Sequence, residues 1–547
     1  MGERHVIVVG SGPSGAQAAK QAVEDGLSVT MVDVGVDDEA TRSLIPAGTF
    51  EHLRRTDEQQ FRYFVGNIDR TEISTVRAGA QLTPPRAFAI RDAEALAPMI
   101  NHDFSPMRSF ALGGLGAAWG TGCYTFNGYE LERAGLGGTP LRAFYDRVAG
   151  DIGISGALED DTAAEFLACR PVQPAQTLDT NAAVIFGNYK KRRSELIERG
   201  FRLGRSPLAM LSEPLVRDGI RRDPNDFEDM DFYSDKTRSL YRPRYTIGEL
   251  LERENFRYLR GTMALAFFDQ GDNVRLSCRD LSTGTMFELQ ADRLILAAGA
   301  MGTTTLVLRS LQRFEERVPL LSNSYQYIAS VNLPMLGRPA ASRRHSYAQL
   351  IGVLAPPDHP LETLVVTFFS YRSLLLFKLV KELPLHPALG LLAARLTETA
   401  LTIVGVHHPE RASPQKWMAL RRGGEDGILE TSYALSADES RAVRCHLKQT
   451  RRTLAGLACI PLTTIDPGNG SSIHYAGGLR FTADTGDALG TAPDGRLHAA
   501  RNVRVADSAN WLWLPSKGPT LTLMAAARRV AADVAAELGA APQTRVR

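Results

Sequence analysis

The stretch His5-Val-Ile-Val-Val-Gly10-Ser-Gly-Pro-Ser-Gly15 decides the fold. Its first five residues are mostly β-branched, which predicts a buried strand. The G-x-G-x-x-G pattern follows at once, and the alanine-rich residues after Gly15 predict a helix. In such a unit Gly10 forms the tight turn, Gly12 lets the backbone approach a pyrophosphate, and Gly15 lets the helix pack closely on the strand.

A second predicted strand, Leu27 to Val32, ends at Asp33, which lies 18 residues after Gly15. An acidic side chain at this distance is placed to accept hydrogen bonds from ribose hydroxyls. It disfavours a 2′-phosphate, which argues against NADP. The N-terminus therefore predicts a dinucleotide site, and a glycine-rich turn in an unrelated α/β domain is the alternative.

Two later segments have the same strand-to-helix character. Residues 293–298 predict a buried strand that ends in small residues before Gly299, and small residues are needed where a backbone passes close to a ligand. Residues 502–506 predict another strand, followed by Asp507 and by an alanine-rich helix over 523–538. Asp507 could face the ribityl or phosphate region of a cofactor, or the unit could simply pack on the sheet.

The composition is that of an ordinary globular protein of 547 residues, long enough for two to four domains. Lys and Arg number 63 against 61 Asp and Glu, so the formal charge is +2 and nothing indicates a nucleic-acid partner. The five cysteines are scattered without a C-x-x-C pair, which argues against a zinc site or a disulfide framework. With no signal-peptide pattern and no apolar run of 18 residues, we expect a cytoplasmic protein without a membrane span or metal.

The motifs along the chain resemble those of the glucose–methanol–choline oxidoreductases, and most closely the pyranose 2-oxidase branch of that family. The matching segments run nearly the whole length of the chain and keep the family's order. They are GSGPSG (10–15), MVDVG (31–35), GGLGAAW (113–119), LRAFYDRV (141–148), IGISG (152–156), LILAAGAMG (294–302), SIHYAGGLR (472–480), VADS (505–508) and GPTLT (518–522).

The resemblance implies an α/β protein with a Rossmann-like FAD-binding domain and an interleaved α+β substrate domain. The first would comprise residues 1–150, 236–318 and 466–547, and the second residues 151–235 and 319–465. Ala118 stands where some relatives attach FAD through a histidine, so we expect non-covalent FAD. The implied cofactor-binding residues are Gly10, Gly12, Gly15, Asp33, Gly114, Ala118, Ala298, Gly299, Asp507 and Thr520.

The family's catalytic histidine corresponds to His474, which would accept the hydroxyl proton while a hydride passes to flavin N5. Gly518 stands where relatives carry an Asn or His that pairs with this base. Lys517 is the nearest polar residue, and it could orient an alkoxide or stabilise reduced-flavin charge, or point to solvent. The Tyr475 hydroxyl is expected near the pocket, and His407-His408 either line that pocket or are structural.

The expected activity is oxidation of a small alcohol, with O2 or another electron acceptor, and the expected setting is a biosynthetic pathway. A sugar, glycoside or aminocyclitol hydroxyl is favoured by the resemblance. The apolar stretch Tyr371–Gly405 could be core, a lid or contact in a homo-oligomer, or a surface for an apolar substrate. A lipid, sterol or polyketide alcohol is therefore the alternative substrate class. Because the partner of His474 is missing, a non-oxidative lyase and a flavin-binding protein without enzyme activity are further alternatives.

Overall fold

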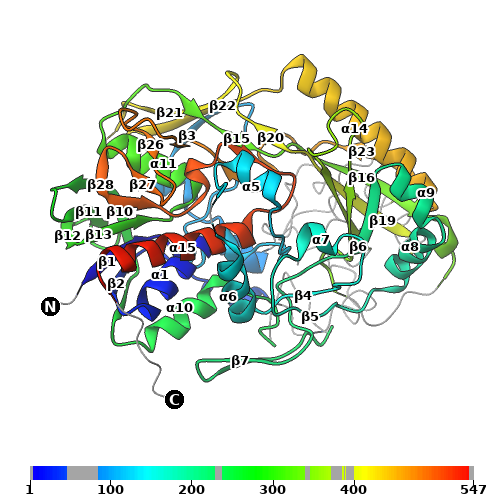
Figure 1. Cartoon of the computed structure of the whole chain (residues 1–547), viewed down its shortest axis with the longest axis horizontal. Coiled ribbons are helices and arrows are strands. Elements are labelled where there is room, and N and C mark those ends of the chain that lie inside the picture. Colours follow the sequence, from blue (N-terminus) through cyan, green and yellow to red (C-terminus); the bar gives the residue numbers. More distant parts are fainter. Residues whose placement is uncertain are drawn as a thin grey trace.

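The computed structural model describes residues 4–45, 48, 84–138, 140–227, 237–338, 345–370, 385–386, 389, 399–424 and 426–540. Most of the predicted apolar stretch Tyr371–Gly405 lies outside these residues, so its three interpretations stay predictions. Figure 1 shows the described elements in two groups, one around a mostly parallel sheet and one around an antiparallel sheet.

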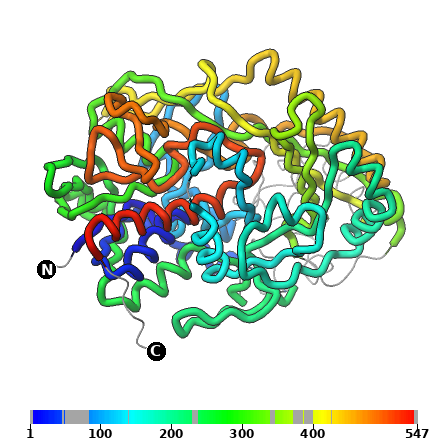
Figure 2. The backbone as a smooth tube through the Cα atoms, viewed as in Figure 1, coloured from blue at the N-terminus to red at the C-terminus, as the bar shows by residue number. Residues whose placement is uncertain are grey.

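Segments from the beginning, middle and end of the chain form one eight-stranded sheet, in the order β25-β26-β27-β28-β13-β1-β2-β9. Its parallel centre consists of β9 (Phe256–Leu259), β2 (Ser28–Val32), β1 (His5–Val9), β13 (Arg293–Leu296) and β28 (Ala500–Val505). The blue, green and red parts of the tube therefore lie together in Figure 2. The short strands β25 (Arg480–Phe481), β26 (Gly490–Thr491) and β27 (Arg496–Leu497) extend one edge.

Helices α1 (Pro13–Glu24) and α15 (Thr520–Glu537) pack side by side against this sheet, and Figure 1 shows the red α15 along the blue α1. Short side chains meet between them, among them Ala19, Ala527 and Ala531, all fully buried. Such small residues let two backbones approach closely, which explains why both helices are alanine-rich. The sequence predicted β1 at its observed bounds and the starts of β2 and α15 to within three residues.

The second sheet is antiparallel, in the order β23-β16-β19-β18-β17-β6. Helices α8 (Thr180–Lys191), α9 (Arg193–Glu198) and α14 (Ala437–Gly456) share one apolar core with it. The strands are β6 (Phe201–Arg205), β16 (Tyr325–Asn332), β17 (Leu350–Leu354), β18 (Leu364–Ser370), β19 (Leu401–His407) and β23 (Cys459–Ile465). Strand β6 thus joins a sheet whose other strands come much later in the chain.

The remaining elements connect these two groups. The helices are α4 (Ala93–Leu96), α5 (Gly128–Ala134), α6 (Arg142–Ile152), α7 (Ala163–Phe166), α10 (Pro243–Leu251) and α11 (Gly299–Ser310), with 3-10 turns η1 (Arg42–Leu44), η4 (Pro84–Ala89), η5 (Gly114–Ala117), η6 (Leu333–Met335) and η7 (Ser508–Asn510). The strands are β3 (Met99–His102), β4 (Ser155–Gly156), β5 (Gln173–Pro174), β7 (Leu215–Arg217), β8 (Ile220–Arg222), β10 (Thr262–Asp269), β11 (Val274–Asp280), β12 (Met286–Ala291), β14 (Val318–Pro319), β15 (Leu321–Ser322), β20 (Glu410–Arg411), β21 (Lys416–Arg421), β22 (Ile428–Tyr433), β24 (Tyr475–Ala476) and β29 (Trp513–Leu514).

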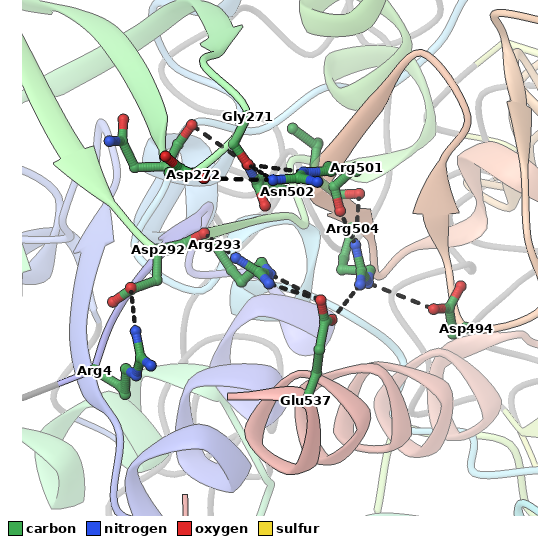
Figure 3. A network of polar contacts seen from close by, with 12 residues as sticks. Arg4, Gly271, Asp272, Asp292, Arg293, Asp494, Arg501, Asn502, Arg504 and Glu537 are labelled. Atoms are coloured by element: carbon green, nitrogen blue, oxygen red, sulfur yellow. Dashed lines mark hydrogen bonds and ion pairs between the residues drawn. The ribbon is translucent and has the colours of Figure 1, made fainter. Parts of the chain in front are cut away.

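A network of ion pairs fastens the end of α15 to the sheet (Figure 3). Glu537, in the last turn of α15, accepts from Arg293 of β13 at 2.7 Å and also pairs with Arg504 of β28. The Arg504 side chain is only 2% exposed, so its charge depends on Glu537 and, at 3.8 Å, on Asp494. The network fixes the far end of α15 and thereby helps to position its N-terminus at the opposite edge of the sheet.

The described residues contain neither a candidate membrane span nor a candidate metal site. Within the described ranges, no helix is both long and apolar enough to cross a membrane. In the same part of the chain, no cluster of three or more His, Cys, Asp or Glu side chains could hold a metal ion.

Candidate active site

The predicted cofactor residues gather at one edge of the parallel sheet. Gly10 follows β1, Asp33 follows β2, Ala298 lies two residues after β13, and Asp507 lies two residues after β28. Because these strands are parallel neighbours, their carboxyl ends meet at the same edge. In open α/β sheets this edge is where ligands bind.

The glycines of the first loop have distinct physical roles. Gly10 has φ +98°, and a Cβ there would lie 2.6 Å from the carbonyl oxygen of Ala297. A Cβ on Gly15 would lie 1.9 Å from the carbonyl oxygen of Gly10, so close helix-strand packing requires glycine. A Cβ on Gly12 would meet nothing within 4 Å. Gly12 is therefore not required for packing, and it leaves open space at the start of α1.

This open space fits a phosphate-bearing cofactor. Helix α1 begins with Pro13 at its first turn, and no side chain caps its N-terminus. An uncapped helix start presents N–H groups and the positive end of the helix dipole to an anion. Gly114 also lies here: a Cβ on it would come within 3.1 Å of Gly12 Cα. Two glycine-rich segments thus leave room for a ligand at the same point.

The carboxylate of Asp33, which the sequence predicts to face a ribose, accepts hydrogen bonds from within the protein. Its Oδ2 accepts from the Ser11 hydroxyl at 2.5 Å and from the Tyr258 hydroxyl at 2.8 Å. Ser11 Oγ in turn accepts from the Gly113 N–H at 2.9 Å. Burial raises the pKa of Asp33 to about 6, against the lowering effect of these hydrogen bonds. Oδ2 thus ties both glycine-rich loops together through Ser11.

Asp507 is engaged within the protein rather than free to face a ligand. Its Oδ2 accepts from the Gly299 N–H at 2.9 Å and from the Thr303 hydroxyl at 2.6 Å, and its Oδ1 accepts from the Ala509 N–H at 2.9 Å. Burial raises its pKa to about 6. The carboxylate therefore caps the start of α11 and shapes the loop around Gly299, a role that differs from the predicted contact.

The other predicted cofactor residues lie in suitable but different environments. Ala298 and Gly299 are exposed although the strand before them is buried, and a Cβ on Gly299 would meet nothing within 4 Å. Ala118 is buried at the end of η5. Thr520 begins α15, whose N-terminus has no side-chain cap.

His474 immediately precedes β24, which pairs with β15 through Ser322 and Tyr475. This pairing brings Asn323 beside the histidine, with Asn323 Oδ1 at 3.1 Å from His474 Nδ1. The Asn323 amide nitrogen donates to the carbonyl oxygens of His408 at 2.7 Å and Pro515 at 3.0 Å. The amide oxygen must therefore face the ring. Since that oxygen only accepts, Nδ1 carries the proton and Nε2 keeps a free lone pair.

The surroundings of His474 keep the ring neutral. Burial lowers its pKa to about 4. A neutral ring with a free Nε2 lone pair can accept a proton at pH 7. On this side a Cβ placed on Gly518 would lie 3.6 Å from Nε2 and 3.5 Å from the Tyr124 ring. Gly518 therefore lies beside the base, as the resemblance implied, but it offers no side chain to pair with it.

His407, the last residue of β19, stacks on His474 with ring centroids 5.2 Å apart. On its other side it stacks on Tyr325 at 4.0 Å. Burial and the neighbouring His474 lower the pKa of His407 well below its usual value. Of the two predicted pocket-lining histidines, His407 thus lies against the candidate base. His408 instead bonds to His446, with 3.1 Å between their Nδ1 atoms.

Lys517 takes neither of its two expected places, beside the alkoxide or reduced flavin, or in solvent. Its ammonium group is fully buried and donates to Glu130 Oε2 at 2.6 Å and to Glu165 Oε2 at 3.2 Å. It also donates to the Glu165 carbonyl at 2.8 Å. With its protons engaged by α5 and α7, the ammonium group is a structural cation. A catalytic role for Lys517 is therefore not supported, because its donors point into this ion-pair cluster.

The Tyr475 hydroxyl is likewise used internally: it donates to the Gly470 carbonyl at 2.6 Å and accepts from the Met107 N–H at 2.9 Å. Asn323 and Tyr325 had no predicted role, although both lie within the candidate site. The weak signal for Asn323 was a short polar run, Ser-Asn-Ser, between two apolar segments.

Comparison with known proteins shows a shared fold at low sequence identity. No protein-family model and no curated protein matches the chain. Pyridoxine 4-oxidase from Mesorbium loti is 14% identical with a TM-score of 0.56, over 97% of this chain and 99% of the other. An FAD-dependent oxidoreductase from Chaetomium thermophilum is 13% identical with a TM-score of 0.58, over 98% of this chain and 100% of the other. The protein therefore has, over nearly its whole length, the fold of these two proteins.

Proposed function

We propose that the protein is an FAD-dependent oxidoreductase of the glucose–methanol–choline type that oxidises an alcohol to a carbonyl. The observation that carries the proposal is His474, a neutral imidazole whose Nδ1 is held by Asn323 and whose Nε2 is left free. Three features at the neighbouring sheet edge support FAD: the uncapped start of α1, the open space at Gly12 and the carboxylate of Asp33. The fold shared with an FAD-dependent oxidoreductase adds to this support.

The segment that carries His474 is tied directly to the cofactor edge. The Gly477 N–H donates to the Ser508 carbonyl at 3.0 Å, and the Ser508 hydroxyl donates to the Tyr475 carbonyl at 2.7 Å. The base therefore has a fixed position relative to β28 and the start of α11. When bound, FAD would accept the hydride that leaves the alcohol carbon.

The protein's own part of the reaction is proton transfer and orientation. His474 Nε2 accepts the proton of the substrate hydroxyl, and such a positioned base typically contributes about 10²–10⁴-fold. Asn323 accepts a hydrogen bond from Nδ1, so the Nε2 lone pair lies on the side of the ring away from Asn323. Gly10, Gly12, Gly15, Asp33, Gly114, Ala298 and Gly299 would hold the dinucleotide without a covalent bond. O2 or another acceptor would then reoxidise the flavin.

For the substrate we propose a polar hydroxyl compound of the sugar, glycoside or aminocyclitol class, as the resemblance to the pyranose 2-oxidase branch favours. His407, Tyr325 and Tyr124 make the surroundings of His474 aromatic and polar, which supports a polar substrate. An apolar alcohol remains the alternative substrate. That alternative rests on the apolar stretch Tyr371–Gly405, most of which lies outside the described residues.

An anaerobic screen of the flavin-loaded protein tests the proposal. Sugars, aminoglycosides and lipid alcohols are added in turn, and flavin absorbance near 450 nm is followed. We expect bleaching by at least one polar alcohol in wild type and a rate at least about 100-fold lower in His474→Ala. A protein that does not bind FAD, or a flavin that no alcohol bleaches, would refute the proposed function.

A further inference from the structure

His407 has the environment of a ligand-binding residue rather than of a structural histidine. Strand pairing of β16 with β19 sets Tyr325 opposite His407, and the two rings stack at 4.0 Å with 19° between their planes. On the other face lies His474, at 5.2 Å and 21°. The sheet register thus fixes where the His407 ring lies, parallel to the candidate base.

One nitrogen of His407, Nδ1, is buried without a hydrogen bond within the described part of the chain. Nε2 of His408 is also buried without a partner, but His408 bonds to His446 through its Nδ1, and His474 bonds to Asn323. A buried polar group without a partner costs about 1–3 kcal/mol, so such a group commonly marks a position that a ligand completes. Because its pKa is lowered well below the usual value, the His407 ring is neutral and carries one N–H donor.

Neither Gly518 nor Lys517 of the C-terminal loop takes this place. Gly518 faces His474 Nε2 without a side chain, and Lys517 donates to Glu130 and Glu165 instead. Any second polar group at the reacting hydroxyl must come from another element. His407, at the end of β19, is the ring that lies directly against His474.

We propose that His407 contacts the reacting hydroxyl and donates a hydrogen bond to its oxygen while His474 Nε2 accepts its proton. This inference rests on the proposed function. The oxygen is then held between two neutral imidazoles, one from the C-terminal segment beside the parallel sheet and one from the antiparallel sheet. Donation to the oxygen stabilises the negative charge that develops there as the proton leaves. No further bond is made or broken, and the proton and hydride go to His474 and the flavin as before.

The test compares His407→Phe, which keeps an aromatic ring but removes both nitrogens, with wild type. We expect kcat/KM, measured by anaerobic flavin reduction, to fall by about 100-fold or more, as for loss of a donor to a developing oxyanion. We expect the Tm of the protein to stay level or rise, because an unpaired buried polar group has been replaced by an apolar one. His407→Gln should recover at least tenfold of the lost kcat/KM, since its amide can donate.

His498→Phe is the matched control, because His498 Nε2 already bonds to the Thr482 carbonyl at 3.0 Å outside the site. Its Tm should fall while kcat/KM stays within threefold of wild type. The inference is overturned if His407→Phe keeps kcat/KM within threefold, if its Tm falls as in the control, or if His407→Gln recovers nothing. If His407→Phe does not fold, His407→Leu replaces it under the same criteria. Absence of bleaching in wild type would instead refute the proposed function. The difference in Tm between His407→Phe and His498→Phe would then test by itself whether the buried His407 nitrogen lacks a partner.

Discussion

At the scale of single residues, the tautomer of His474 follows from the two hydrogen bonds that Asn323 donates. The Asn323 amide nitrogen is committed to the His408 and Pro515 carbonyls, so its oxygen alone faces His474. A histidine whose Nδ1 carries the proton presents Nε2 as the basic atom. In the proposed function Asn323 would therefore be a positioning residue that acts through His474.

Replacing Asn323 tests this assignment. Asn323→Leu removes the acceptor at Nδ1 while keeping side-chain volume, so the two neutral tautomers become mixed and the ring loses its orientation. We expect kcat for flavin reduction to fall about tenfold or more, since a wrong tautomer disables a histidine base. Asn332→Leu, which replaces a buried amide that bonds to Asn181 at the far end of the neighbouring β16, should lower Tm but leave kcat unchanged. Equal kcat values in Asn323→Leu and wild type would show that Asn323 does not set the tautomer.

The pH dependence of the reaction gives a second test at this scale. Burial lowers the pKa of His474 to about 4. The ring must be neutral to accept a proton, so activity is present above this pKa and is lost as the pH falls through it. We expect log kcat/KM to be level from pH 7 to about pH 5 and to fall with unit slope below about pH 4, measured in stopped-flow reduction over the range in which the protein stays folded. An acid limb near pH 6.5 would contradict a buried, neutral base.

At the scale of elements, the β1–α1 turn contains one glycine that close packing requires, Gly15, and one that packing does not require, Gly12. Gly15 cannot carry a Cβ, because the Gly10 carbonyl would lie 1.9 Å away. Gly12 has φ −60° and open space around a Cβ. Gly15→Ala should therefore lower the Tm of the protein without cofactor, whereas Gly12→Val should keep that Tm and weaken FAD binding at least tenfold. Thermal melts and FAD titrations measure both, and full FAD affinity in Gly12→Val would place the phosphates elsewhere.

The loop before α15 is held by a buried ion pair that links it to α5 and α7. Lys517→Met leaves the carboxylates of Glu130 and Glu165 without their cation. Removing one partner of a buried pair costs roughly 3–5 kcal/mol, so the free energy of unfolding in urea should fall by about that amount. The folded fraction should keep its kcat, because the ammonium does not face His474. A loss of kcat without loss of stability would restore a catalytic role for Lys517.

The sequence predicts elements whose signal is local and misses contacts made across sheets. The β1–α1–β2 unit follows from strand composition, glycine spacing and Asp33, all within 30 residues. His474 and Gly518 were paired through the resemblance. Asn323 could not be paired with His474, since 151 residues separate them and only the β15–β24 pairing joins them. The direction of Lys517 likewise depends on acidic residues about 350 and 390 positions away.

At the scale of the whole molecule, the candidate site lies where the two sheets meet. The parallel sheet brings residues from both ends and the middle of the chain to one edge. The antiparallel sheet contributes Tyr325 from β16 and His407 from β19, and Asn323 lies between β15 and β16. His474 lies between these groups, bonded to Asn323 and stacked on His407. We therefore propose that the interleaved domain plan serves to place a base and its partners over a cofactor.

The proposed role of His474 is tested most directly by single-turnover reduction of bound flavin by an alcohol, without oxygen, in wild type and in His474→Ala. We predict a yellow protein whose FAD is released on denaturation. A polar alcohol should bleach the bound flavin in wild type, and should bleach it about 10²–10⁴-fold more slowly in His474→Ala at equal FAD content. Equal bleaching rates in the two proteins would contradict the assignment of His474 as the base.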